Sequence, residues 1–196
     1  MANRKRYKRQ DTGNKKRAAK VHAEEVLCAG FGGQGIMFMG KLLAEAGLNA
    51  GKFVTWMPSY GAEVRGGTAY SMAKISDNQI ASPVVTNPDI LIVMNKPSLV
   101  KYEEKLKAGG ILISNKSLID APSKRRDAKV LNIPMTEIAS KIGDIRASNM
   151  VAIGALAKRS KMLSMKNIVA ALKNMLKGKE GLLLVNKKAL EKGYKI

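Results

Sequence analysis

A cluster of glycines at residues 30–35, reading Gly-Phe-Gly-Gly-Gln-Gly, constrains this chain more than any other feature. It follows a short apolar run at residues 25–29, which reads as a buried strand. The apolar residues after the glycines have helical spacing, which predicts a helix that ends at Gly51. A G-x-G-x-x-G turn between strand and helix suits a phosphate or another anion, because the backbone approaches closely and the helix N-terminus is positive. The alternative is a glycine turn needed only to pack strand against helix.

The remaining pattern alternates short strands with helices. We expect strands at residues 52–57 (halted by Pro58), 68–76 (half-exposed), 89–94 (buried), 111–114 and 129–133 (closed by Pro134). Helices are expected at residues 97–108, 136–142, 147–158 and 164–176, the last capped by Ser164. This order predicts an α/β fold, a doubly wound and mostly parallel sheet with a helical C-terminal part.

Two common uses of a glycine loop are disfavoured. A dinucleotide site needs an acidic residue at the end of the second strand to bind the ribose. Here residues 52–57 read Lys-Phe-Val-Thr-Trp-Met, and Glu45 lies inside the preceding helix. No Lys-Ser/Thr pair follows the glycines, so a Walker A loop is absent as well. A stand-alone nicotinamide-dependent oxidoreductase therefore remains only an alternative interpretation.

A second glycine-rich segment, residues 59–68, carries chemistry-bearing side chains. Arg65 could grip a phosphate or carboxylate with two hydrogen bonds, and Glu63 could orient it. The other interpretation is a surface ion pair of little energetic worth. Ser59 and Tyr60 could donate hydroxyl hydrogen bonds, but no base lies nearby to make Ser59 a nucleophile.

One further polar residue, Asn95, follows the buried strand at residues 89–94. Ligands of open α/β sheets bind at the carboxyl ends of the strands, where the glycine loop is also expected. Asn95 is therefore a candidate for ligand contact. Capping of the next helix is an equally good interpretation.

Composition excludes several classes of function. The chain of 196 residues has one cysteine, Cys28, and one histidine, His22, so it cannot form an internal disulfide, an iron–sulfur cluster or a Cys-rich zinc site. We assign no metal ligand and no catalytic residue to this chain. The longest apolar run, residues 90–94, is too short to span a membrane, and no secretory signal is recognisable, so a cytoplasmic location is expected.

The charge of +20 is unevenly spread: nine of the first twenty residues are basic and only Asp11 is acidic, which gives this segment a charge of +8. We predict a disordered basic tail at residues 1–22 and a single α/β domain at residues 23–196. The tail could be a nucleic-acid arm of an accessory protein, a solvated tail, or a segment that docks on an acidic partner. Nucleic acid is the less favoured interpretation, because no aromatic side chains interleave the charges.

Four stretches together resemble one family, the gamma subunits of the 2-oxoacid:ferredoxin oxidoreductases. They are GFGGQGIMFMGKLLAEAG (residues 30–47), VTWMPSYGAEVRGGTAY (54–70), SPVVTNPDILIVMNKPSL (82–99) and GGILISNKSLI (109–119). The resemblance runs from about residue 25 to the C-terminus, and the basic tail is not part of it. The PSYGAEVRGG motif looks closest to the 2-oxoglutarate and branched-chain 2-oxoacid enzymes, with pyruvate less expected.

The resemblance implies a multi-subunit enzyme that decarboxylates a 2-oxoacid oxidatively with thiamine diphosphate, acylates coenzyme A and reduces ferredoxin. It implies that alpha and beta subunits carry the thiamine cofactor and that beta and delta subunits carry the iron–sulfur clusters. The gamma chain is implied to buttress the assembly and help form the coenzyme A pocket. On this basis the expected coenzyme A contacts are Gly32, Gly33, Gln34, Gly35 and Arg65, and the ligand or interface candidates are Tyr60, Glu63, Gly66, Gly67 and Asn95.

Overall fold

A six-stranded sheet forms the centre of the part of the chain described by the computed structural model, residues 22–59 and 68–196. The spatial order is β2-β3-β1-β4-β5-β6. The strands are β1 (Ala23–Gly30), β2 (Phe53–Ser59), β3 (Ala69–Ser76), β4 (Ile90–Val93), β5 (Ile111–Asn115) and β6 (Lys129–Ile133). The basic tail lies outside the described residues, except for its last residue, so its predicted disorder and the domain division at residue 22 stay predictions.

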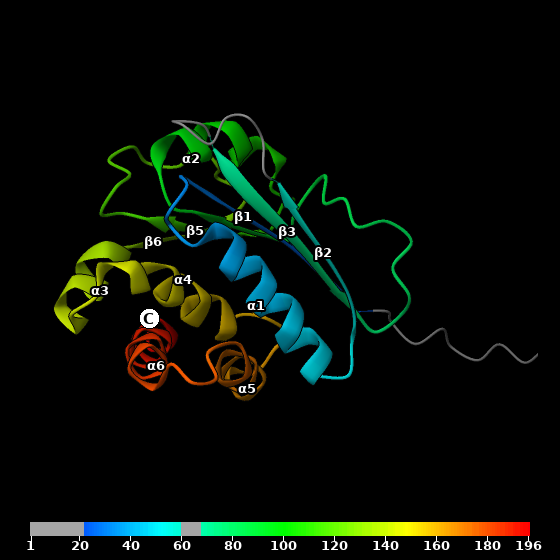
Figure 1. Ribbon diagram of the computed structural model, residues 1–196. Coiled ribbons are helices and arrows are strands. Elements are labelled where there is room, and N and C mark those ends of the chain that lie inside the picture. The colour runs from blue at the N-terminus through cyan, green and yellow to red at the C-terminus, as the bar shows by residue number, and fades with distance from the viewer. Residues whose placement is uncertain (1–21, 60–67) are drawn as a thin grey trace, which may run out of the picture.

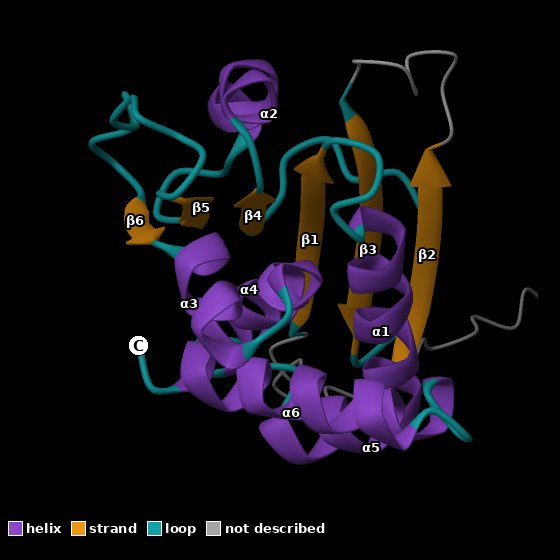
Figure 2. Ribbon diagram, turned by 60° about the vertical axis from the view of Figure 1, so that its left-hand side comes forward, coloured by secondary structure: helices purple, strands orange, loops and turns teal. Residues whose placement is uncertain are grey.

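The sheet is mixed, and five of its six strands share one direction. β1, β4, β5 and β6 pair in parallel, whereas β3 runs antiparallel to both of its neighbours, β1 and β2. In Figure 2 the arrows of β1 and β2 point to one edge of the sheet and the arrow of β3 to the other. The carboxyl ends of β1 and β4 therefore meet at one edge, where open α/β sheets place their ligands.

Helices cover both faces of the sheet unequally (Figure 1). α2 (Lys96–Tyr102), continued by a 3-10 turn at Glu103–Lys105, lies on one face. α1 (Ile36–Asn49) and α4 (Ser148–Ala157) lie on the other, and α5 (Met165–Met175) and α6 (Glu180–Tyr194) lie farther out on that side. α3 (Met135–Ile142) and a second 3-10 turn (Ile145–Ala147) lead into α4. The predicted α/β class, mostly parallel sheet and helical C-terminal part are confirmed.

Alternation along the strands divides the core in two. Val26 and Cys28 of β1 face the side of α1 and α4, whereas Leu27 and Ala29 face the side of α2, and all four are fully buried. β4 does the same with its four apolar residues. Because both faces of these strands are covered, the sequence shows a continuous apolar run rather than alternating polarity.

Several predicted boundaries are confirmed. α1 ends just before Gly51, whose positive φ of 69° suits a glycine after a helix. β6 spans residues 129–133 as predicted and is followed by Pro134. Ser164 caps α5 by accepting a hydrogen bond from the Asn167 N–H, and Asn167 completes a capping box.

Three local predictions are wrong. β2 continues through Pro58 to Ser59, because β2 is an edge strand in the described sheet and a proline there leaves no ladder donor missing. The helix predicted for residues 97–108 ends as a 3-10 turn at Lys105, and the Arg125 guanidinium donates to the carbonyls of Glu103 and Leu106 at this end. β3 is largely buried rather than half-exposed, because strands flank it on both sides and α1 packs on it.

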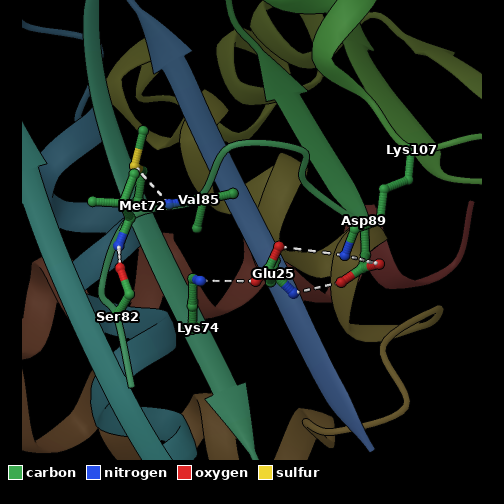
Figure 3. A network of polar contacts seen from close by, with 8 residues as sticks. Glu25, Met72, Lys74, Ser82, Val85, Asp89 and Lys107 are labelled. Atoms are coloured by element: carbon green, nitrogen blue, oxygen red, sulfur yellow. Dashed lines mark hydrogen bonds and ion pairs between the residues drawn. The ribbon is translucent and has the colours of Figure 1, made fainter. Parts of the chain in front are cut away.

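The edge opposite the glycine loop is tied together by charge (Figure 3). Glu25 accepts from Lys74 at 2.8 Å and from Lys107 at 3.3 Å, and Lys107 also reaches Asp89 at 2.9 Å. The backbone N–H of Glu25 donates to Asp89 at 2.8 Å. These contacts join β1, β3 and the segments before β4 and β5. They therefore stabilise the fold at the edge of the sheet opposite the candidate site.

α6 was not predicted, and glycines explain how it packs. A Cβ on Gly154 of α4 would strike the Leu190 carbonyl oxygen of α6, and one on Gly193 would strike the Val151 carbonyl oxygen of α4. The two helix backbones therefore touch directly at this pair of glycines. Gly154 thus serves helix packing.

Candidate functional site

The glycine loop crosses the carboxyl-end edge of the sheet, as predicted. β1 ends at Gly30 and α1 begins at Ile36. Gly33 and Gly35 have φ values of 88° and 73°, in the left-handed region that L side chains rarely adopt. Gly32 and Gly33 are exposed, so their backbone groups are open to a ligand. The conformation therefore requires glycine at two of the predicted contact positions.

The start of α1 has no side-chain cap. Gly35 is the N-cap residue, and the first turn contains no acidic side chain. An α-helix cannot pair its first N–H groups internally, and its N-terminus carries a partial positive charge. The end of α1 is thus able to accept an anion through backbone N–H groups.

Gln34 holds this loop to the neighbouring strand. Its side-chain oxygen accepts from the Phe31 N–H at 2.7 Å and from the Asn95 amide at 3.4 Å, and its Nε2 donates to the Met94 carbonyl at 3.4 Å. The amide is therefore engaged by the protein itself. Gln34 thus fixes the shape of the loop, and its contact with coenzyme A stays a prediction.

Asn95 caps α2, one of the two roles considered for it. Its Oδ1 accepts from the Ser98 N–H at 2.9 Å, and its Nδ2 donates to Gln34. Only 2% of the residue is exposed. Ligand contact by Asn95 stays a prediction, and its observed contacts tie the start of α2 to the glycine loop.

An open pocket of about 240 Å³ lies against the helix side of the loop. Its wall combines the loop, the start of α1, the second 3-10 turn, α4 and the start of α6. The lining residues are Gly33, Gly35, Phe38, Asp144, Arg146, Ala147, Asn149, Leu176, Leu182 and Asn186. The glycine loop therefore opens onto a cavity with both polar and apolar walls.

Asn149 is the notable polar residue of this pocket. It is 6% exposed, and its buried Oδ1 has no hydrogen-bond partner, whereas buried polar atoms are normally paired. The Asn149 amide also lies so close to Gly35 that a Cβ there would strike its Nδ2. Asn149 lines the pocket beside the N–H groups of α1, but its Oδ1 is shielded from solvent, so the side chain must rotate before this atom can accept a hydrogen bond from a ligand.

Charge at the pocket rim comes from Arg146 and Asp144. Arg146 donates from Nε to Oδ1 and from Nη2 to Oδ2 of Asp144, both at 2.9 Å. These hydrogen bonds hold the pKa of the Asp144 carboxyl below its usual range. The Arg146 side chain is 80% exposed, so its Nη1, which takes no part in this pairing, is accessible from solvent.

The sequence analysis did not identify Arg146 or Asn149 as site residues. A signal for Asn149 does exist, since it is an amide in α4, a helix whose ten residues are all buried. An amide held in such a helix needs either a partner within the protein or a ligand.

The other predicted contact residues, Tyr60, Glu63, Arg65, Gly66 and Gly67, lie in residues 60–67, outside the described part of the chain. The strand residues on either side of this segment lie at the edge of the sheet where the glycine loop begins. Gly30 pairs with Ala69, and Ser59 pairs with Tyr70 across β2 and β3. Both ends of the segment are therefore anchored at the edge where β1 ends.

The one cysteine of the chain, Cys28, is not available for thiol chemistry at this site. Cys28 is fully buried on the α1 side of β1, and burial raises its thiol pKa to about 12. Within residues 22–59 and 68–196, no three His, Cys, Asp or Glu side chains gather as metal ligands would. None of the helices in the same ranges is long and apolar enough to cross a bilayer.

Comparison with known proteins identifies the family. The family described as "Pyruvate ferredoxin/flavodoxin oxidoreductase" matches residues 25–196. The chain belongs to this family. The resemblance to 2-oxoacid:ferredoxin oxidoreductase gamma subunits is thereby confirmed, and the match begins where the basic tail has ended.

Two relatives illustrate the range of family members. Ketoisovalerate oxidoreductase subunit VorA of Methanothermobacter marburgensis is 36% identical over 169 residues, which are 86% of this chain and 35% of that protein. The chain thus spans about a third of the VorA length. 2-Oxoglutarate synthase subunit KorC of Methanocaldococcus jannaschii is 34% identical over 187 residues, which are 92% of this chain and 97% of that one.

Two solved structures share the fold of this family member. The gamma subunit of a keto/oxoacid ferredoxin oxidoreductase from Geobacter sulfurreducens matches 88% of this chain and 96% of its own, with 28% identity and a TM-score of 0.75. A 2-oxoglutarate:ferredoxin oxidoreductase from Magnetococcus marinus, with 2-oxoglutarate, coenzyme A and succinyl-CoA bound, matches 88% of this chain and 30% of its own, with 26% identity and a TM-score of 0.80. The same fold therefore occurs both as a separate chain and within a longer one.

Proposed function

We propose that this chain is the gamma subunit of a 2-oxoglutarate:ferredoxin oxidoreductase that acts with alpha, beta and delta-type subunits. The complex would decarboxylate 2-oxoglutarate oxidatively, transfer the acyl group to coenzyme A and pass the electrons to ferredoxin. Within it, this chain would support assembly and form part of the coenzyme A site. The observation that carries the proposal is the uncapped start of α1 beside a pocket with an unpaired buried amide oxygen.

Coenzyme A suits this site chemically. Its phosphates are acceptors for the N–H groups at the start of α1, which a helix cannot pair internally. Its amide and amino N–H groups could donate to Oδ1 of Asn149 once that side chain rotates to expose the atom, which is shielded from solvent in this structure. The Magnetococcus enzyme whose structure has coenzyme A bound shares this fold over 88% of our chain. That likeness supports a coenzyme A contact in this chain.

The residues of this chain do not fit an iron–sulfur cluster. Such clusters are held mostly by Cys thiolates, usually four. This chain has one cysteine, which is buried with a pKa raised to about 12. We therefore assign the clusters and the thiamine diphosphate, which would supply the decarboxylation chemistry, to partner subunits.

The choice of 2-oxoglutarate rests on the extent of similarity. The Methanocaldococcus KorC chain, named as a 2-oxoglutarate synthase subunit, is matched over 97% of its length. The VorA chain, named for ketoisovalerate, is matched over 35%. A relative that corresponds from end to end is the better guide to a separate gamma chain. A gamma subunit common to the pyruvate and ketoisovalerate enzymes of Thermococcus kodakarensis is also matched over 95% of its length, but at 30% identity against 34% for KorC, so we rank 2-oxoglutarate first.

The roles of the individual residues follow from their contacts. Backbone N–H groups of Gly32, Gly33 and Gly35 would bind an anionic part of coenzyme A, and Gln34 would hold the loop in shape. Arg65 is proposed to bind a second anionic group from the segment anchored beside Gly30. Tyr60, Glu63, Gly66 and Gly67 stay candidates for ligand or subunit contact. None of these residues needs to exchange a proton, so the chain positions coenzyme A and leaves bond making to its partners.

The test uses the complex co-expressed with and without this chain. Viologen or ferredoxin reduction is measured with thiamine diphosphate, coenzyme A and, in turn, 2-oxoglutarate, 2-oxoisovalerate and pyruvate. We expect activity only with this chain present, highest with 2-oxoglutarate. Normal turnover by verified partners without the chain would contradict a role in catalysis, and a preference for another acid would correct the substrate alone.

A second test addresses the coenzyme A contact. Arg65→Ala should raise the apparent KM for coenzyme A about tenfold or more, because charge-assisted hydrogen bonds to phosphate are lost. Decarboxylation without coenzyme A should change little. The matched control is Arg126→Ala, which removes the same charge from an exposed position before β6, at the opposite edge of the sheet. An unchanged KM, or an equal rise in the control, would remove Arg65 from the site.

A further inference from the structure

The C-terminal helices of the described chain carry a concentrated positive charge, most of which lies outside the proposed coenzyme A pocket. Residues 135–196 include thirteen lysine and arginine residues and only four acidic ones. The rest of the chain between the tail and residue 135 is close to neutral by comparison. Most of the charge of the folded part therefore lies on the α3 to α6 side, away from the sheet (Figure 1).

Part of this charge lines one groove. A cavity of about 270 Å³ between α3 and α6 is bounded by Lys141, Ile142, Lys188, Glu191, Lys192 and Lys195. We call it the lysine groove. All four lysines are exposed, and none of them takes part in an ion pair among residues 22–59 and 68–196, where the only ion pair on α6 joins Lys187 to Glu191 at 3.9 Å.

Helix dipoles explain only part of this arrangement. A lysine near the C-terminus of a helix is favoured by the partial negative charge there, which accounts for Lys141 in the last turn of α3, and for Lys192 and the C-cap residue Lys195 at the end of α6. Lys188 lies in the middle of α6 and gains nothing from the helix end. Four like charges around one cavity repel one another, so their arrangement calls for an anionic partner.

The same helix also exposes apolar side chains. Leu184, Lys188, Glu191 and Lys195 follow one another at intervals of three and four residues, so they share one stripe of α6. Leu184 is 55% exposed, and Ile196 at the end of the chain is 44% exposed. A stripe that combines unpaired ammonium groups with exposed leucine differs from a surface that meets only a phosphate backbone.

We propose that the lysine groove is a docking surface for an acidic segment of another polypeptide. Glutamate and aspartate side chains of such a segment would pair with the four lysines, while an apolar side chain of the segment would cover Leu184. Nucleic acid is a poorer fit, because its phosphates gain nothing from Leu184 and the groove offers no arginine fork for bidentate phosphate binding. This surface is separate from the coenzyme A pocket, so the proposal stands independently of the proposed function.

The experiment measures binding to the full chain by fluorescence anisotropy at low salt. The probes are a labelled glutamate peptide containing two leucines, the same peptide with serines in place of leucines, and a thymidine oligonucleotide of equal charge. The groove variant carries Lys141→Gln, Lys188→Gln, Lys192→Gln and Lys195→Gln. The matched control carries Lys166→Gln, Lys173→Gln, Lys177→Gln and Lys179→Gln, which remove four exposed charges from α5 and the segment after it.

We expect the groove variant to bind the leucine-containing peptide about tenfold more weakly or worse, because four surface ion pairs are lost. The α5 control should change affinity by less than about threefold. Leu184→Ser should weaken the leucine-containing peptide and leave the serine-containing peptide unchanged. The basic tail is the same in every variant, so a difference in affinity between variants comes from the substituted residues.

Three outcomes would overturn the proposal. The peptides could fail to bind at low salt, or the two quadruple variants could lose affinity equally, which would indicate a general field. The oligonucleotide could also lose more affinity than the peptide in the groove variant, which would make the groove a nucleic-acid surface. Circular dichroism of each variant verifies that it is folded, and Leu184→Ser tests the same surface without any change of charge.

Discussion

The direct backbone contact between α4 and α6 leads to a sharp prediction about Gly154→Ala. A Cβ at Gly154 would strike the Leu190 carbonyl oxygen and would lie 2.9 Å from both the Leu190 carbonyl carbon and the Tyr194 nitrogen. These are backbone atoms of a helix, so no side-chain rotation relieves the clash and the helices must separate. Overpacking of this kind costs about 3 kcal/mol, at the upper end of its usual range.

Helix propensity acts in the opposite direction, so a fall in the free energy of unfolding would show that the backbone clash outweighs it. Alanine stabilises a helix interior by about 1 kcal/mol relative to glycine. We therefore expect a net loss of about 2 kcal/mol in the free energy of unfolding, and a fall in Tm of roughly 4–8 °C. The matched control is Gly181→Ala in α6, where a Cβ meets nothing within 4 Å, and this variant should gain stability.

Thermal and urea unfolding followed by far-UV circular dichroism measure these changes. Gly193→Ala should lose a similar amount, because its Cβ would strike the Val151 carbonyl oxygen across the same contact. The double variant should lose less than the sum, since one separation of the helices relieves both clashes. If Gly154→Ala proved as stable as the parent, or fell together with Gly181→Ala, the inferred backbone contact would be wrong.

Three further predictions concern single buried groups. Burial raises the pKa of the Glu24 carboxyl above its ordinary value of 4.5, although Ser160 and the Lys161 N–H donate to it. The folded state therefore binds the proton more tightly than the unfolded state, and the free energy of unfolding falls as pH rises from about 4.5 through the raised pKa. Glu24→Gln should flatten this fall, which urea unfolding at a series of pH values measures. The Cys28 thiol, with a pKa of about 12 and no exposed surface, should react with a thiol reagent at neutral pH only as fast as the chain unfolds, so fast native-state labelling would contradict its burial. Asn149→Ala should raise the apparent KM for coenzyme A about two- to tenfold, because it removes the hydrogen bond that we propose the rotated side chain makes to the ligand. An unchanged KM would mean that Asn149 has only a structural role.

The parts of the fold that were predictable from sequence depend on local rules. A glycine that must adopt positive φ, as at Gly35, and a serine or asparagine before a helix, as at Ser164 and Asn95, act within a few residues of themselves. Continuous apolar runs likewise indicate strands covered on both faces, and β1 and β4 are such strands. The glycine loop could thus be placed between a strand and a helix from sequence alone.

The wrong predictions all depend on contacts between distant segments. Pro58 ends a strand by local rules, but those rules do not reveal that β2 lies at the edge of the sheet, where a proline is tolerated. α6 carries many lysines and few buried residues, so its pattern is weak until Gly154 of α4 is known to face it. The unpaired oxygen of Asn149 is visible only when α4 is packed beside the glycine loop.

The described part of the candidate site would bind its ligand through backbone groups. Reactive side chains therefore give little indication of its function. Gln34 and Asn95 use their amides to hold the loop, the end of β4 and α2 together, which leaves the N–H groups at the start of α1 as the proposed binding surface. Such a surface needs shape and charge but no nucleophile or proton donor. A chain of this kind can hold a shared anionic substrate while another subunit supplies the reacting groups. Substitutions that alter the loop shape, such as Gln34→Ala, should therefore change the binding of coenzyme A more than the rate of decarboxylation.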